Sequence, residues 1–541
     1  MNVFDFLKRP DYGAFSKEKL SYNDATKRVR RKLKDYSAES IVDCALNYIN
    51  AKGREDNGLY KLPWVVLLVV KLVLEDHEIR LHSGKICTQE IFLDACNFLW
   101  NNSGKQIDAS RSNRLLLSFR SLINVQLIFQ RNDTWSFLRI PALIGLKNAE
   151  HPLSILFKEE FGLSPLQFNF YAFLFMAPLV IHGNNRYIKN SYFDYVRLKY
   201  NVELENFLTG YSKNLSELRD LLRNESEERI ANFGKERSPV EFVETPWLMQ
   251  YPFLKKEDYL FAWHPSLYAM SLEETVHKRL SKYGQRYTQL FSEVFEDYVL
   301  SLLKQLEYEL IDEKEYKKKV QDKSVPAVDA FLKVNDEINL LIECKMSLFQ
   351  DEILVSDDEK TVYYKFNNVR KAFVQGWKAG EIIRKNQQFH ISKNSVDFLI
   401  VVVNRRLNCG SAAHFRTIMP DNIFQNIYPK NSIGQLHDTH LSNMPIENIL
   451  IMSIDVFEQF VLAVSNKKLN IIEFFNKVAE MNSNPNIPYL NLDEVIFKDF
   501  GIKKRFEVEL LTQERNKILE YGKELLLPKN KICSKDGLNS A

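Results

Sequence analysis

The sequence predicts an α/β fold class, in which a mixed β-sheet flanked by helices follows a large, mainly α-helical N-terminal domain. A long amphipathic helix pattern at 287–306 precedes apolar, strand-like segments at 328–334, 338–345 and 396–403. Strands that alternate with helices are typical of a sheet whose faces are covered by helices. Before about residue 270, in contrast, the apolar side chains recur mainly at helical spacing.

Three regions can be distinguished along the 541 residues, a length that exceeds one ordinary hydrophobic core. We place a helical recognition or assembly domain at 1–270, an α/β domain at 271–465, and a helical extension with a Lys-rich tail at 466–541. A strongly charged stretch between about 210 and 245 predicts a solvated helix followed by a linker, and so marks a candidate domain boundary.

The composition indicates a globular chain, with 45% hydrophobic and 26% charged residues. A net charge of +3 neither demands nor excludes a polyanionic partner, because a basic groove can lie on a nearly neutral molecule. The six cysteines show no zinc-ligand spacing and fit a reducing compartment. The apolar runs at 62–74 and 168–181 are too short to span a bilayer and read as buried helices. With no signal-peptide pattern, we expect a cytoplasmic protein without a membrane partner.

The densest basic run of the chain lies in the N-terminal domain and includes Lys27, Arg28, Arg30 and Arg31. The simpler interpretation is a solvated helix face, and the alternative is contact with nucleic-acid phosphates. No motif with a recognisable chemistry occurs elsewhere in this half. It could recognise DNA, a partner subunit, or both.

The elements of the α/β domain follow in order. The stripe at 287–306 repeats at i, i+3, i+4 and i+7, which predicts an amphipathic helix packed on a large surface. The polar residues Asn335–Glu337 predict a turn that joins two antiparallel strands. The later elements are, in order, a helix over about 366–386, a strand at 396–403, a strand at 449–453 that runs directly into a helix, and helical segments from about 466.

The register of the hairpin brings chemically important residues together. If Val334 faces Ile338, then Asp329 lies directly across from Glu343, and both side chains project from the same face. Lys345, two residues further along, projects from that face as well. The simplest alternative is a buried Glu–Lys ion pair on a strand.

Two opposed carboxylates beside an apolar segment are unfavourable, because like charges repel and buried charges are costly. A hard divalent cation, Mg²⁺ or Mn²⁺, resolves both problems, since carboxylate oxygens are its preferred ligands. A lysine beside the cation could orient or deprotonate a water, or stabilise a developing negative charge. Two acids and an amine on one face suit the cleavage of a phosphodiester.

Asp329, followed after thirteen residues by Glu343-Cys344-Lys345, resembles the D…E-x-K signature of the PD-(D/E)XK, or restriction-endonuclease-like, nuclease superfamily. The resemblance covers about 285–460 and implies a restriction-endonuclease-like core that cleaves phosphodiesters by metal-activated water. The proline of the signature usually stands immediately before the aspartate, whereas Pro326 here lies three residues ahead.

Two further residues are implied by this resemblance. The segment Phe295–Tyr298 resembles the helix that leads the fold in Mrr-like branches, where a glutamate joins the metal site. Glu296 is the first choice for that role and Glu293 the second, and an ordinary exposed helix carboxylate is the plain alternative. The segment 371–380 resembles the helix after the E-x-K strand, in which Gln375 would approach the active site; a solvent-facing glutamine is an equally simple interpretation.

Other constellations are weaker. His437 and His440 could form a metal pair on a helix, but their surroundings resemble a loop. Arg405 and Arg406 follow the strand at 396–403 and could contact phosphate or form a plain surface pair. The run 315–319 could do likewise, although a solvated loop is the simpler interpretation.

We therefore expect an Mg²⁺- or Mn²⁺-dependent DNA endonuclease, of the kind found in prokaryotic anti-phage defence or restriction. Glu296, Asp329 and Glu343 would hold the metal, and Lys345 and Gln375 would complete the catalytic site. DNA is the expected partner, ahead of RNA, and the chain could form a homo-oligomer or join a partner subunit of a defence system. The alternative is a nuclease-like subunit that binds DNA or assembles a defence complex without cleaving.

Overall fold

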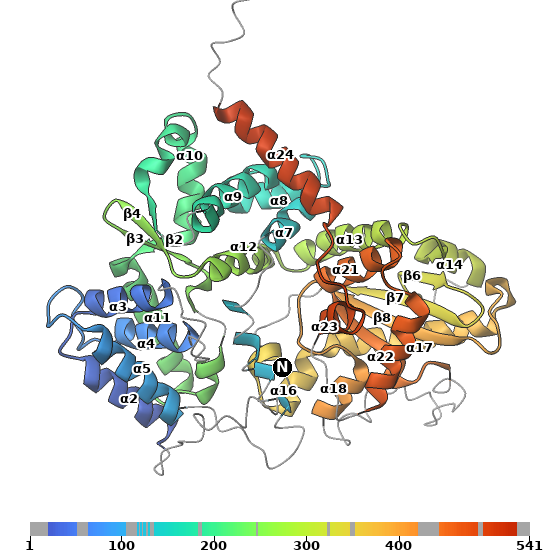
Figure 1. Cartoon of the computed structure of the whole chain (residues 1–541), viewed down its shortest axis with the longest axis horizontal. Coiled ribbons are helices and arrows are strands. Elements are labelled where there is room, and N and C mark those ends of the chain that lie inside the picture. The colour runs from blue at the N-terminus through green and yellow to red at the C-terminus, as the bar shows by residue number, and fades with distance from the viewer. Residues whose placement is uncertain are drawn as a thin grey trace, which may run out of the picture.

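The computed structural model describes residues 20–50, 63–103, 116–117, 120–121, 123–125, 128–129, 135–181, 187–244, 247–321, 325–346, 352–419, 443–484 and 491–526. It is a mixed α/β structure with many helices and two mixed β-sheets (Figure 1). The α/β fold class predicted from the sequence is thereby confirmed.

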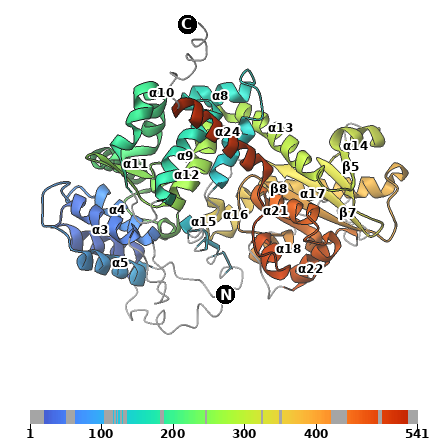
Figure 2. The ribbon, with the colours of Figure 1, turned by 45° about the horizontal axis from the view of Figure 1, so that its top comes forward.

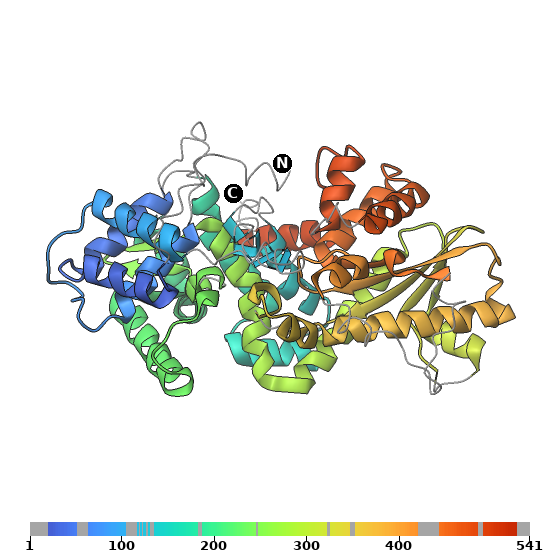
Figure 3. The same ribbon diagram turned by 90° about the horizontal axis from the view of Figure 1, so that it is seen from below.

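Four helices form an N-terminal bundle at one end of the molecule, far from the larger sheet in all three ribbon views (Figures 1, 2 and 3). They are α2 (Tyr22–Leu33), α3 (Ala38–Asn50), α4 (Pro63–Glu75) and α5 (Gln89–Ser103). Helix α4 is apolar on nearly every side and is buried because its neighbours in the bundle and α11 pack around it. The prediction of a buried helix at 62–74 is confirmed.

A second group of helices follows the bundle in the chain, and most of it lies between the bundle and the larger sheet (Figure 1). Its helices are α7 (Arg139–Ile144), α8 (Pro152–Phe161), α9 (Pro165–Ile181), α10 (Asp194–Tyr211), α11 (Leu215–Phe233) and α12 (Pro265–Leu280). Among the described residues no single helix is long and apolar enough to cross a membrane. Only α8 and α9 taken together, with a bend of 44° between them, have that length and apolar composition. The solvated helix predicted in the charged stretch is present as α11, which is largely exposed and packs on α4 with one side.

The helical half also contains a small sheet that the sequence pattern did not predict. Its strands are β1 (Tyr187–Lys189), β2 (Ser212–Asn214), β3 (Phe253–Lys256) and β4 (Tyr259–Ala262), in the order β1-β4-β3-β2. Strands of three or four residues are too short to show a two-residue alternation, which explains the omission.

The larger sheet has the order β5-β6-β7-β8-β9. The strands β5, β6 and β7 are antiparallel neighbours, whereas β7, β8 and β9 run parallel. Their bounds are Glu309–Asp312, Ala330–Lys333, Ile338–Lys345, Val396–Val403 and Ile449–Ser453. The predicted strands are all present, and β5 is an addition. The run 315–319, interpreted as a loop, belongs to helix α14 (Glu313–Val320), which an Asp312 side chain caps.

Helices cover both faces of this sheet (Figure 3). Helix α13 (Gly284–Leu303) shares a core with Leu340 and Ile342, together with α21 (Ile454–Ser465) and α22 (Ile471–Ser483). Helix α17 (Asn367–Lys385) packs on the other face, with Leu341 and Leu399, beside α18 (Ala412–Ile418). The helices predicted at 287–306 and 366–386 are confirmed as α13 and α17.

The close approach of α17 to the sheet depends on a glycine. A Cβ atom at Gly376 would lie 2.4 Å from Leu399 Cδ2, which is closer than packed carbon atoms come. The small residues predicted to face the sheet therefore do so, and they bring the functional side chains of α17 close to β7.

The remaining elements connect these layers. They are α15 (Glu352–Val355), α16 (Glu359–Lys365), α23 (Leu492–Glu494), α24 (Glu509–Leu526) and the short η helices at 136–138, 190–193, 239–243, 247–249, 281–283, 387–389, 446–448 and 495–499. Helix α24 packs on α9, where Asn169 Nδ2 donates a hydrogen bond to Glu514 Oε1 (2.9 Å). The C-terminal extension thus packs against the helical half. The domain boundaries predicted at 270 and 465 stay predictions.

Candidate functional site

The β6–β7 hairpin has the register expected from the sequence. Ala330 pairs with Ile342 and Lys333 with Asn339, so Asp329, the residue before β6, stands across from Glu343. The turn is fixed by Asn335, whose Oδ1 accepts hydrogen bonds from the backbone N–H groups of residues 337 (2.9 Å) and 338 (2.8 Å). The prediction of opposed carboxylates is confirmed.

We call Asp329, Glu343 and Lys345 the hairpin site. Asp329 Oδ2 accepts a hydrogen bond of 2.6 Å from the backbone N–H of Cys344. The ammonium group of Lys345 forms an ion pair with Glu343 Oε1. Glu343 is only 1% exposed, and its other oxygen, Oε2, has no hydrogen-bond partner among the described residues. An unpartnered buried carboxylate oxygen is costly unless something else binds it.

Gln375 connects helix α17 to the hairpin site. Its Nε2 donates a hydrogen bond of 2.6 Å to the carbonyl of Ala327, and its Oε1 lies 3.4 Å from Lys345 Nζ. Glu343 and Lys345 project toward α17 because they alternate on β7 with the residues that face α13. The alternative of a solvent-facing Gln375 does not hold.

Glu296 approaches from α13, on the opposite side of the sheet. It is half-buried, whereas Glu293 is exposed, which supports Glu296 as the better candidate. Burial, and then the charge of Asp329, raise the pKa of Glu296 to about 7. The two carboxylates therefore share one electrostatic environment.

The same effects act on the hairpin site. Burial, followed by the charge of Asp329, raises the pKa of Glu343 to about 8. Burial also raises the pKa of Asp329, although the Cys344 N–H opposes the shift. Burial lowers the pKa of Lys345, but the charge and hydrogen bond of Glu343 together with the charge of Asp329 outweigh it and raise the pKa above the ordinary value. Lys345 is thus held as a cation, which favours charge stabilisation over proton abstraction.

Two of the three residues predicted to bind the metal, Asp329 and Glu343, are arranged as ligands of a hard divalent cation. Asp329 and Glu343 are opposed carboxylates with raised pKa values, and Glu343 Oε2 is free to bind. Within the described ranges, no three His, Cys, Asp or Glu side chains are close enough together to hold one ion. Glu296 would have to move toward the pair to become the third ligand.

The two arginines after strand β8 form ion pairs with carboxylates of other elements. Arg405 pairs with Glu274 (3.0 Å), and Arg406 pairs with Asp455 and with Asp493 (3.1 Å). Both arginines are largely buried, which favours the alternative of a structural pair, and their contact with phosphate stays a prediction.

The basic run on α2 lies on the N-terminal bundle, far from the hairpin site (Figure 1). Arg30 is directed inward and lies 3.9 Å from carboxylate oxygens of Glu75 and Asp76. Lys27, Arg28 and Arg31 are exposed, and their contact with nucleic acid stays a prediction. His437 and His440 fall outside the described residues.

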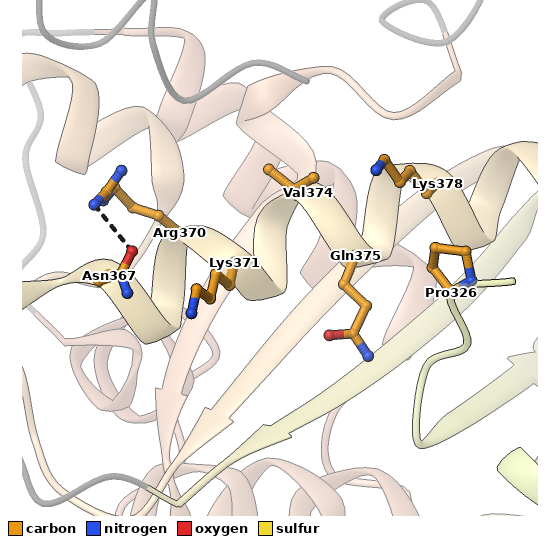
Figure 4. A pocket seen from close by; sticks show the side chains of 7 residues that line it. All are labelled: Pro326, Asn367, Arg370, Lys371, Val374, Gln375 and Lys378. Atoms are coloured by element: carbon orange, nitrogen blue, oxygen red, sulfur yellow. Dashed lines mark hydrogen bonds between the residues drawn. The ribbon is translucent and has the colours of Figure 1, made fainter. Parts of the chain in front are cut away.

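A cavity of about 440 Å³ beside the hairpin site was not predicted. It lies along α17 and is lined by Pro326, Asn367, Arg370, Lys371, Val374, Gln375 and Lys378 (Figure 4). We call it the basic groove. The sequence signal was present, because its residues on α17 recur at the three- and four-residue spacing of one helix side, but a solvated face gives the same pattern.

No family model, no curated protein and no solved structure matches this chain. The residues themselves therefore carry the assignment that follows.

Proposed function

We propose that this protein is a metal-dependent nuclease of the PD-(D/E)XK superfamily, with a restriction-endonuclease-like core, that hydrolyses phosphodiester bonds of DNA in anti-phage defence or restriction. The observation that carries the proposal is the hairpin site, in which a β-strand register opposes Asp329 to Glu343 beside Lys345. The order of elements supports it: helix α13, the β6–β7 hairpin, the crossover helix α17 and the parallel strand β8.

Asp329 and Glu343 would hold the metal, with Glu296 as the third ligand. A bound Mg²⁺ lowers the pKa of a coordinated water and polarises the phosphoryl oxygen. Lys345, kept protonated by Glu343, would stabilise the negative charge that develops on the phosphate. Gln375 positions that ammonium group and is itself anchored on the Ala327 carbonyl.

A scaffold without activity is the competing function. The closed Glu343–Lys345 ion pair favours it, because this pair neutralises one carboxylate without any metal. A scaffold gives no physical reason, however, to leave Glu343 Oε2 buried without a partner.

Cleavage of circular and linear DNA by the purified chain, with Mg²⁺, with Mn²⁺ or with chelator, separates the two functions. Asp329→Asn, Glu343→Gln and Lys345→Ala should each reduce the cleavage rate by about 100-fold or more, since each removes a ligand or a charge-stabilising group. Asp336→Asn, in the exposed turn of the same hairpin, is the matched control and should cleave like the wild type. Equal cleavage, or equal inactivity, of wild type and Lys345→Ala on every DNA would refute the proposal; an RNA substrate in the same assay tests the target.

A further inference from the structure

We infer that the basic groove on α17 binds the phosphate backbone of the DNA strand next to the scissile phosphate, an inference that rests on the proposed nuclease function. The groove combines a cavity, three cationic side chains and a direct connection to the hairpin site. None of these features alone would distinguish a binding surface from a solvated helix face.

The side chains of the groove form two neighbouring rows on α17 (Figure 4). One row holds Asn367, Lys371 and Gln375, and the other holds Arg370, Val374 and Lys378. Residues four apart share a row because they lie almost one turn apart on the same side of a helix. Both rows therefore contribute cations to the wall of the cavity that α17 forms.

The three cations are available to an anionic ligand. Within the described part of the chain, no carboxylate forms an ion pair with Arg370, Lys371 or Lys378, and both lysines are exposed. This distinguishes them from Arg405 and Arg406, whose charges are already neutralised.

Arg370 is also held in place. Its guanidinium lies 3.6 Å from the centre of the Tyr363 ring, and it donates hydrogen bonds to Asn367 Oδ1 (3.2 Å) and to the Tyr363 carbonyl (3.0 Å). A fixed guanidinium loses little conformational freedom when it binds a phosphate.

Gln375 belongs both to the groove and to the surroundings of Lys345. A strand in the groove would thus continue directly into the hairpin site. Lys371 and Lys378 are separated by about 10 Å along the helix axis, which matches about three phosphate-to-phosphate steps along the axis of one DNA strand. The groove would hold the strand on one side of the cleaved bond.

The test measures binding rather than cleavage, so that the two proposals can fail separately. Asp329→Asn serves as the parent chain, and a fluorescent duplex DNA is titrated by anisotropy without metal between 50 and 200 mM salt. Adding Lys371→Ala and Lys378→Ala should weaken binding about 10- to 60-fold at 0.1 M salt and reduce the salt slope by about 1.8, because two phosphate contacts are lost. Lys371→Arg with Lys378→Arg should bind like the parent.

Lys468→Ala with Lys477→Ala is the matched control, since it removes the same charge from exposed positions near α22 and should leave binding unchanged. Unchanged binding by the groove variant, no binding by the parent, or an equal loss in the control would overturn the groove proposal even if the wild type cleaves DNA. Loss of binding only in the groove variant supports it even if the wild type never cleaves. Tighter binding of a matched RNA duplex would overturn DNA as the ligand.

Discussion

At the scale of single residues, the most informative side chain is Glu343. It is almost completely buried, its Oε1 is paired with Lys345, and its Oε2 has no partner among the described residues. Asp329, which precedes the neighbouring strand β6, adds a like charge. These two carboxylates reduce the stability of the fold unless a cation joins them, because neither burial nor repulsion favours the charged forms.

Divalent metal should therefore stabilise the protein against heat. At a Mg²⁺ concentration ten times the dissociation constant, the free energy of unfolding should rise by about 1.4 kcal/mol, and the melting temperature should rise with it. Asp329→Asn should remove this effect, whereas Asp336→Asn, with its side chain 86% exposed, should retain it. A melting temperature that responds to Mg²⁺ equally in wild type and Asp329→Asn would show that the cation binds elsewhere.

At the scale of elements, helix α17 determines the geometry of both proposed sites. It packs on the sheet through Gly376, its Gln375 reaches Lys345, and the basic groove lies along its side. A displacement of this helix would move Gln375 away from Lys345.

Gly376→Ala tests this dependence. The added methyl group meets Leu399, so we expect a loss of about 1–3 kcal/mol in the free energy of unfolding and reduced DNA cleavage. Gly210→Ala on α10 is the matched control, because a Cβ there would meet only the end of the Arg279 side chain, at 3.0 Å; chemical denaturation should show a smaller loss for it. Equal stability of the two variants would mean that the helix adjusts freely.

The long elements of the α/β part could be predicted because their patterns are local. Helices α13 and α17 show a continuous apolar stripe, and the hairpin register follows from a polar turn between two apolar runs. Strands β1 to β4 could not be predicted, because each is only three or four residues long and because β1 and β2 lie far along the chain from their partners β4 and β3. Contacts distant in sequence leave no periodic signal.

The same reason determines which contacts of the candidate site residues could be predicted. Asp329, Glu343 and Lys345 come together through one short hairpin. The ion pairs of Arg405 and Arg406 could not be predicted, because the carboxylates Glu274 and Asp493 come from α12 and α23, which are distant in sequence. A charge at a strand end does not show whether it meets a phosphate, another part of the chain or water.

At the scale of the whole molecule, two apolar cores each draw on the helical half and on one face of the larger sheet. The N-terminal bundle is also joined to the middle of the chain by a buried ion cluster. Glu241 lies 3.0 Å from Lys71 of α4 and 2.6 Å from Arg237, and it accepts a hydrogen bond from Tyr22 of α2.

This cluster predicts how stability depends on pH. Burial would raise the pKa of Glu241, but Lys71 and Arg237 outweigh it and lower the pKa to about 2. The ion pairs therefore stabilise the fold above the ordinary carboxyl pKa of about 4.3, and this contribution is lost as the pH falls from there toward 2.

Glu241→Gln should cost up to about 3 kcal/mol of unfolding free energy at pH 7, and the difference from wild type should shrink steadily below pH 4.3. Denaturant titrations at several pH values measure this. Glu228→Gln, an exposed change of the same charge on α11, should give a difference that is small at every pH. A difference for Glu241→Gln that persists unchanged at pH 3 would contradict the assignment.

The turn that Asn335 closes has a consequence for how this chain can vary. Side chains alternate along β7 between the two faces of the sheet. A single residue inserted or deleted between Lys333 and Ile338 would therefore shift β7 by one residue relative to β6 and turn each side chain of β7 to the opposite face. Glu343 would then face α13 while Asp329 kept its place, and every residue of the hairpin site would survive in a protein without the site. Substitutions in this loop other than at Asn335 should be tolerated during divergence, whereas changes in its length should not.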